Sequence, residues 1–187
     1  MKYLGSKTLE TKRLILRKTE EQDLKVLWEI LLKKEVSKYY LTSKINKNWE
    51  EEKKWQYKKL DRAGDPHTFI WTLVRKEDHK ILGQISFKEK ENESKDIGWF
   101  LDIPYQRQGY MKEAAEEVLK YMFLEAGISS INTSTAIENP SSWKLMESLG
   151  FQDQKKTRKE KYTLLEEEVD CKEYICTKDD FLERKGE

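Results

Sequence analysis

The sequence contains little that would support a metal centre, a disulfide scaffold or a membrane span. Among 187 residues there are only two cysteines and two histidines. Cys171 and Cys176 have a spacing that fits no zinc pattern, and on one strand they would point to opposite faces, so we expect two structural thiols in a reducing cytosol. No apolar run approaches eighteen residues, and residues 1–7 lack the apolar segment of a signal peptide. We therefore expect a cytoplasmic protein with no metal and no membrane partner.

The chain also lacks an excess of charge of one sign. Its 36 Lys and Arg oppose 35 Asp and Glu, a net charge of +1, so bulk charge gives no ground for a nucleic-acid partner. It is rich instead in large aromatic residues, with six Trp, nine Tyr and six Phe that can fill a core. We find no repeats or linkers, and we expect a single domain over residues 1–187, with a loose lead-in at 1–8 and a tail at 180–187.

The most informative stretch runs from Asp96 to Phe123. Residues 97–103 are apolar and aromatic, as in a buried strand, and Pro104 ends the strand because it has no N–H donor. From Gly109 onward the period becomes helical. The apolar residues of this helix fall on one face, at Met111, Ala114, Ala115, Val118 and Met122.

Between strand and helix lies the loop 106–109. A helix N-terminus has N–H groups without intrahelical partners and a positive dipole end, which together favour a phosphate. Gly109 has no Cβ and would let the backbone approach a ligand closely. The alternative is an ordinary strand–turn–helix connection with a capping glycine, and on this loop alone we favour that alternative.

A second strand–turn–helix unit occupies residues 130–151. In its strand, β-branched residues alternate with other residues. Asn139 and Pro140 then suit the N-cap and the first position of a short helix. Gly150 suits the position after the C-cap. Two such units in tandem, each with polar groups at the turn, change the balance in favour of a ligand site.

Elsewhere the pattern predicts earlier antiparallel strands and a late, charged two-stranded ribbon. Antiparallel strands followed by strand–helix units favour an α/β (α+β) mixed sheet with helices on both faces. One predicted helix has a thin apolar stripe, and it and the ribbon could form a homodimer contact. We expect strands at 13–17, 68–75 and 81–88, helices at 24–32 and 49–62, and the ribbon within 152–177.

The motifs, in their order along the chain, resemble those of the GNAT (GCN5-related) N-acetyltransferase superfamily, and the resemblance covers nearly the whole chain. Residues 106–111 (Gln-x-x-Gly-x-Met) resemble its acetyl-CoA pyrophosphate loop, and 139–142 (Asn-x-x-Ser) with 149–151 (Leu-Gly-Phe) resemble its next motif. Residues 9–17 resemble the start of the ribosomal-protein-alanine/serine N-acetyltransferase subgroup. The resemblance implies the GNAT fold, a mostly antiparallel twisted sheet that is splayed between its fourth and fifth strands to hold the cofactor.

The resemblance also implies an N-acetyltransferase. It would move the acetyl group of acetyl-CoA directly to a primary amine, either a protein N-terminus, for instance a ribosomal one, or a small-molecule amine. Acetyl-CoA would contact the strand end, the loop and the helix after it, and the second helix start. These residues are Phe100, Leu101, Gln106, Arg107, Gln108, Gly109, Tyr110, Met111, Asn139 and Ser142.

Catalytic candidates are fewer. Ser142 is our choice for stabilising or protonating the leaving thiolate, with a plain helix-surface serine as the alternative; Asn139 can likewise be only an N-cap. Asp96 could order a water as general base, although we favour a solvated strand-end carboxylate. Glu160 is a second candidate, because the subgroup has an acid assigned in that area. Tyr39 and Tyr40, in an irregular segment, are candidates for the acceptor pocket.

Two positions depart from the family pattern. Met146 stands where many members have a Tyr that acts as general acid, and its thioether cannot donate a proton. Met111 stands where the loop normally ends in a small residue, which is tolerable if its side chain points to the core. The missing Tyr keeps open a non-catalytic CoA-binding sensor or scaffold, and a module that binds another nucleotide is a third hypothesis.

Overall fold

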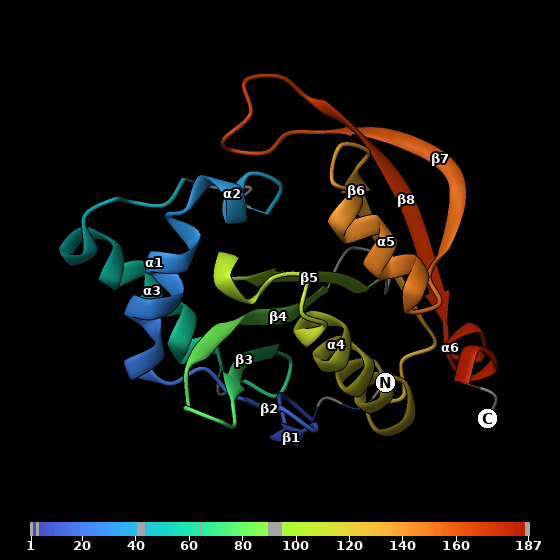
Figure 1. The fold of residues 1–187 in the computed structure, drawn as a ribbon, viewed down its shortest axis with the longest axis horizontal. Helices are drawn as coiled ribbons and strands as arrows, with labels where there is room; N and C mark the ends of the chain where they lie inside the picture. The colour runs from blue at the N-terminus through green and yellow to red at the C-terminus, as the bar shows by residue number, and fades with distance from the viewer. Residues whose placement is uncertain (1, 3, 41–43, 64, 90–94, 186–187) are drawn as a thin grey trace.

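The chain forms two antiparallel sheets that meet at one edge of each (Figure 1). The computed structural model describes residues 2, 4–40, 44–63, 65–89 and 95–185. The larger sheet has the order β1-β2-β3-β4-β5 and the smaller the order β6-β8-β7. The strands of the larger sheet are β1 (Leu9–Glu10), β2 (Leu14–Arg17), β3 (Phe69–Arg75), β4 (Ile81–Glu89) and β5 (Lys95–Leu101). Those of the smaller are β6 (Ser130–Ala136), β7 (Gln152–Glu160) and β8 (Val169–Thr177).

Helices lie in the connections from β2 to β3, from β5 to β6 and from β6 to β7, and one more follows β8 (Figure 1). α4 joins β5 to β6 and continues into one π-helical turn at Tyr121–Glu125. The larger α-helices are α1 (Leu24–Leu31), α3 (Trp49–Ala63), α4 (Tyr110–Lys120), α5 (Pro140–Ser148) and α6 (Lys178–Lys185), and α2 (Lys34–Ser37) is a single turn. None of the helices in the described parts of the chain is both long and apolar enough to cross a bilayer.

Helices cover both faces of the larger sheet, as two neighbouring residues of β5 show. Neighbouring residues of a strand point to opposite faces of its sheet. Leu101 belongs to the main core with Met111, Ala114 and Val118 of α4. Phe100 belongs to a second cluster with Leu27 and other residues of α1. The apolar face predicted for the 111–122 helix is confirmed: all five of its residues are buried. The predicted mixed sheet with helices on both faces is therefore correct.

The two sheets touch at Thr133 of β6, whose hydroxyl donates to the Asp96 carboxylate (2.7 Å) and lies 3.4 Å from the Ile97 carbonyl of β5. β5 and β6 form no ladder with each other and belong to separate sheets. If the two-residue β1 is not counted, they are the fourth and fifth strands, so the splay that the resemblance implied is present at that position. Asp96 is correspondingly half-buried and bonded to Thr133, rather than simply solvated as we favoured.

The two cysteines lie on β8 and are free thiols in different parts of the core. Cys171 packs with Ala136 and Tyr162, whereas Cys176 belongs to the main core. Burial, with a smaller contribution from Asp180, raises the pKa of Cys176 to about 12. The prediction of two structural thiols on opposite faces of one strand is confirmed.

Two segments expected to be loose are attached to the core. At the N-terminus, the Ser6 side chain is buried, and the Gly5 carbonyl accepts a hydrogen bond of 2.8 Å from the Tyr121 hydroxyl. The expected tail contains part of α6, and Phe181 packs in the main core. Short polar segments show no periodicity in sequence, so such attachments are invisible there. The dimer contact through α3 and the ribbon stays a prediction, although Trp55 on α3 is 63% exposed.

We predict that Thr133→Val lowers the free energy of unfolding by about 1–3 kcal/mol, because the half-buried Asp96 carboxylate loses the hydrogen bond from the Thr133 hydroxyl. Urea denaturation measures this change. Thr135→Val is the matched control, since Thr135 lies two residues along the same strand, on the same face, and both side chains are 4% exposed. Equal losses in the two variants would show that the Thr133–Asp96 bond does not hold the sheets together.

Candidate active site

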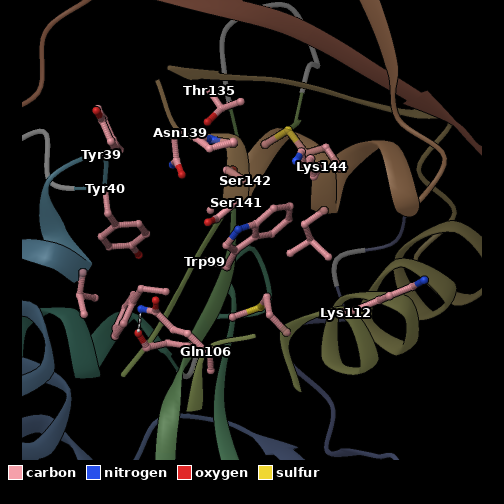
Figure 2. A pocket seen from close by; sticks show the side chains of 18 of the residues that line it. Tyr39, Tyr40, Trp99, Gln106, Lys112, Thr135, Asn139, Ser141, Ser142 and Lys144 are labelled. Carbon is pink, nitrogen blue, oxygen red and sulfur yellow. Dashed lines mark hydrogen bonds between the residues drawn. The ribbon is translucent and has the colours of Figure 1, made fainter. Parts of the chain in front are cut away.

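A cavity of about 560 Å³ opens where β5 and β6 diverge (Figure 2). Its walls come from five places: the end of β5, the loop into α4, the end of β6, the start of α5, and α2 with the residues after it (35–40, here called the α2 segment). Its volume lies within the range of small-molecule sites. Most of the predicted site residues line it, namely Phe100, Leu101, Gln106, Arg107, Gly109, Tyr110, Met111, Asn139, Ser142, Tyr39 and Tyr40.

The loop before α4 is held in an unusual backbone conformation. Arg107 and Gly109 have φ values of 60° and 79°, in the left-handed region that favours glycine. The Gln106 N–H donates to the Ile103 carbonyl (3.2 Å), and its side chain donates to the Leu101 carbonyl (2.9 Å). The Gln106 N–H is thus engaged inside the turn, which leaves the N–H groups nearer the helix start to face a ligand.

Gln108 differs from its neighbours in the loop. Its side-chain amide donates to the Pro104 carbonyl at 2.6 Å, and its own carbonyl accepts a bond of 2.9 Å from Arg13. Among the described residues that line the cavity, Gln108 does not appear. Its predicted contact with the cofactor therefore has no support in this arrangement.

The first turn of α4 gives the cavity its donor-rich wall. α4 begins at Tyr110, so the N–H groups of Tyr110, Met111 and Lys112 have no acceptor within the helix. Two cationic side chains, Arg107 and Lys112, also line the cavity on this side, and Lys144 lines it from α5. Free N–H groups, a positive helix end and the charges of Arg107 and Lys112 together make this wall suited to phosphate oxygens.

α5 supplies the opposite wall. Asn139 occupies the N-cap position and Pro140 the first helical position, as predicted, but within the described chain the Asn139 side chain makes no capping bond. Asn139 and the half-buried Ser142 both line the cavity, and Figure 2 shows them on the same wall. The Asn139 side chain is therefore free of capping and available to a ligand.

Met146 lies one turn beyond Ser142 in α5. It also lines the cavity, and its side chain is only 2% exposed. Met111 belongs to the main core, as the helical period predicted. The family position that often carries a proton donor is thus occupied here by a buried thioether, which cannot serve as an acid.

The α2 segment closes one end of the cavity with Tyr39 and Tyr40. The Tyr40 ring packs edge-on against Phe100, with ring centroids 4.9 Å apart. Burial raises the pKa of the Tyr40 hydroxyl, and a hydrogen bond with Ser86 opposes this only in part. Tyr40 therefore stays protonated at neutral pH and cannot act as a base.

Tyr39 reaches across to the smaller sheet. Its hydroxyl donates to the Glu138 carboxylate at 3.2 Å, and its ring meets that of Tyr162 edge-on at 5.9 Å. These contacts join segments of the two sheets. Tyr39 follows α2, which lies in the chain between β2 and β3 of the larger sheet, whereas Glu138 follows β6 and Tyr162 follows β7 of the smaller sheet.

Asp96 and Glu160 are not among the described residues that line the cavity. Asp96 accepts the bond from Thr133 that joins the sheets. The Glu160 carboxylate accepts from Ser134 and from Arg158 Nε, each at 2.6 Å. Ser134 itself lines the cavity, so its hydroxyl links Glu160 to the cavity.

Several lining residues were missed by sequence reasoning. Glu35, Trp99, Ser134, Lys112 and Lys144 all contribute to the cavity wall. Trp99 lies two residues before the predicted Leu101 on the same strand, so the strand period could have found it. Glu35 could not have been found, because it comes from a separate segment that only the tertiary fold brings near.

The charges of the cavity are divided between its ends. Glu35 is the one acidic residue among the described lining residues, and it comes from the α2 segment with Tyr39 and Tyr40. The three cations come from the loop and from α4 and α5. No group of three or more His, Cys, Asp or Glu suited to a metal occurs in the described ranges. The cavity can therefore take a molecule with phosphates at one end and an amine at the other.

Comparison with known proteins shows which family and which relatives this chain is similar to. The acetyltransferase (GNAT) domain family matches residues 13–152. An uncharacterized N-acetyltransferase, p20 of Bacillus licheniformis, is 30% identical over 148 residues, covering 78% of this chain and 82% of that protein.

Two solved structures share the fold. Ribosomal-protein-S5-alanine acetyltransferase from Vibrio fischeri has a TM-score of 0.77 at 19% identity, covering 94% of this chain and 99% of that one. Spermidine N-acetyltransferase from Vibrio cholerae, in complex with CoA and spermine, has a TM-score of 0.76 at 18% identity, covering 90% and 98%.

We predict that Asn139→Ala changes the free energy of unfolding by less than about 0.5 kcal/mol, below the loss of about 1 kcal/mol typical of a capping Asn. Thr177→Ala is the contrasting variant, because the Thr177 hydroxyl accepts from the Asp180 N–H (3.1 Å) at the start of α6. Urea denaturation of both variants measures the difference. A loss at Asn139 as large as that at Thr177 would mean that its side chain caps α5 in solution.

Proposed function

The chain belongs to the acetyltransferase (GNAT) domain family, and from this we propose that it transfers the acetyl group of acetyl-CoA directly to a primary amine, on a protein N-terminus or a small molecule. The observation that carries the proposal is the donor-rich loop and helix start at one end of a cavity between two diverging strands. Acetyltransferases of this family use acetyl-CoA as donor, and the residues of this chain that would hold it line that cavity.

The pyrophosphate of acetyl-CoA would lie at the loop before α4. Gly109 has no side chain, and its left-handed backbone turns the chain into the helix so that the N–H groups of Tyr110 and Met111 face outward from the helix end. Arg107 and Lys112 add positive charge beside them. A dianionic group fits this wall by hydrogen bonding and by charge.

The pantetheine arm would lie along β5. β5 is the edge strand of the larger sheet on the side of the cavity, so part of its backbone near Phe100 and Leu101 is not paired with β4. An amide-containing arm could pair with it as an added strand does. Asn139, free of capping, would bind an amide of the same arm from the opposite wall.

The acceptor amine would enter from the end formed by the α2 segment. Glu35 gives that end a negative charge, which attracts a protonated amine, and the rings of Tyr39 and Tyr40 give it an apolar wall. The related V. fischeri enzyme is named for a ribosomal-protein alanine and the V. cholerae enzyme for spermidine. Both kinds of acceptor carry a primary amine, so a panel that contains polyamines and N-terminal peptides distinguishes them.

Ser142 is the proposed group that stabilises or protonates the thiolate released when the amine nitrogen takes the acetyl carbon. It lines the cavity in the first turn of α5, and Met146 one turn further on cannot supply a proton. Glu160, reached through Ser134, is the proposed acceptor of the amine proton. Asp96, bonded to Thr133, is the weaker choice.

The buried Met146 also favours a second candidate function, a CoA-binding sensor or scaffold that does not catalyse transfer. Such a module would keep the loop and the β5 edge but need no proton donor on α5. Binding of CoA without release of free thiol, over a panel of polyamines and of Ala- and Ser-initiated peptides, would support it.

We predict that CoA and acetyl-CoA raise the melting temperature, whereas ATP and NAD do not. At 100 times the Kd a ligand stabilises the native state by about 2.7 kcal/mol, which for a chain of this size corresponds to about 5–10 °C. Differential scanning fluorimetry measures the shift. An equal response to ATP would favour a general nucleotide site, and no response to CoA would contradict the proposed function.

We predict that Ser142→Ala lowers kcat by about 100-fold, the lower range for loss of one hydrogen-bond donor to a developing negative charge, while the KM for acetyl-CoA changes little. Free-thiol release with an amine found active in the panel above measures both constants. Ser148→Ala, at the far end of the same helix, is the control, because its hydroxyl bonds only the Leu145 carbonyl of its own turn (2.8 Å). Wild-type kinetics in Ser142→Ala would leave that residue as a surface serine.

A further inference from the structure

We propose that Arg13, immediately before β2 of the larger sheet, is a positioning residue that sets the loop 107–110 for phosphate binding. The inference rests on the proposed function, since it assumes that this loop holds the pyrophosphate of acetyl-CoA. Arg13 is not among the described residues that line the cavity. It acts from behind the loop, through other residues.

Arg13 binds the loop and the helix after it at several points. Its Nη1 donates to the Gln108 carbonyl at 2.9 Å, and its Nε donates to the Glu113 carboxylate of α4 at 2.6 Å. Its guanidinium carbon lies 4.2 Å from the centre of the Tyr110 ring. One side chain from residue 13 therefore fixes a loop carbonyl, the first helical residue and the first full turn.

The conformation of the loop explains why such support is needed. Arg107 and Gly109 both adopt left-handed backbone angles, and for Arg107 this conformation costs energy that its surroundings must offset. Gln108 lies between them, and its carbonyl is the atom that Arg13 holds. Arg13 also lies against Gly109 itself, because a Cβ built there would meet Arg13 Nη2 at 3.3 Å.

Arg13 also compensates a charge that would oppose a phosphate. Glu113 lies in the first turn of α4, and its side chain is only 20% exposed. Its carboxylate accepts from the Thr11 hydroxyl (2.6 Å), the Arg13 backbone N–H (2.8 Å) and Arg13 Nε. Burial alone would raise the pKa of Glu113, but these donors lower it on balance. The carboxylate is thus charged, and without the guanidinium its field would act on the phosphate end of the cavity.

A second arginine bound to α4 separates this role from ordinary stabilisation. Arg184 of α6 donates to the Ser148 carbonyl (3.0 Å) and to Glu116 of α4 (3.1 Å), and it lies over the Phe181 ring. It makes the same three kinds of contact as Arg13: a carbonyl, a glutamate of α4 and an aromatic ring. It does so away from the loop, so Arg184→Gln removes comparable contacts without disturbing residues 107–110.

The experiment compares Arg13→Gln with Arg184→Gln in the full chain, using calorimetry with CoA and thermal shift with millimolar pantetheine, which has the arm without the pyrophosphate. Arg13→Gln should weaken CoA binding by about tenfold, equivalent to 1.4 kcal/mol, and leave the pantetheine response unchanged. Arg184→Gln should leave both unchanged. Arg13→Lys keeps the charge but cannot reach the Gln108 carbonyl and Glu113 together, so it should recover only part of the affinity.

Each result has a definite meaning. Equal CoA affinities in Arg13→Gln and Arg184→Gln, or equal loss for CoA and pantetheine, would overturn the positioning role. If Arg13→Gln fails to fold, the Arg13→Lys variant decides: full wild-type affinity for CoA contradicts the inference, and a partial loss confined to CoA supports it. Failure of the proposed function is distinguishable, because the wild-type chain would then not bind CoA at all.

Discussion

The structure depends on the lateral contact between β5 and β6, in which the Thr133 hydroxyl donates to the Asp96 carboxylate and also lies 3.4 Å from the Ile97 carbonyl. On one side of this contact the two sheets are held together. On the other side they diverge, and the cavity lies between the end of β5 and the end of β6. An edge strand has backbone groups that need partners. A divergence of two sheets therefore creates, without any special side chain, an extended slot that an amide-containing molecule can complete.

The position of α4 gives the two ends of this slot different charge and hydrogen-bonding groups. Since α4 connects β5 to β6, its N-terminus must lie at the end of β5 where the sheets separate. The free N–H groups and the positive dipole of α4 thus face the same cavity as the β5 edge. The opposite end is closed by the α2 segment, which contributes Glu35. A donor that begins in phosphates and ends in a thioester can then meet a cationic acceptor arriving from the other side, which is the geometry that an acetyl transfer between the two requires.

Most of this arrangement could be predicted from the sequence because it follows from local rules. The helical period of Met111, Ala114 and Val118 predicted which face of α4 is buried, and Pro140 and Gly150 marked the two ends of α5. The ten predicted cofactor positions were chosen by motif, and nine of them line the cavity, with Gln108 as the exception. Their roles in binding remain predictions.

The contacts between distant segments could not be predicted. Arg13 and Glu113 are separated by 100 residues, and Asp96 and Thr133 by 37. Periodicity says which face of an element is buried but not which polar group it will meet. Within the expected lead-in and tail, Gly5 and Phe181 are held by partners far along the chain, which periodicity does not reveal either. Sequence patterns thus located the ligand-facing wall, whereas the residues that support it from behind became visible only in the fold.

The chemistry of the site then depends on the fact that the side chain at position 146 of α5 is not a proton donor. With Met146 buried where a proton donor is common in the family, our proposal relies on Ser142 and Asn139, which line the same cavity. A serine hydroxyl has an ordinary pKa far above that of a thiol, so it stabilises a thiolate by hydrogen bonding more readily than by giving up its proton. The leaving thiolate can in that case take its proton from solvent. Such a site would gain its rate by orienting the two reactants, and in our proposal Arg13 contributes to that orientation by setting the loop that holds the pyrophosphate.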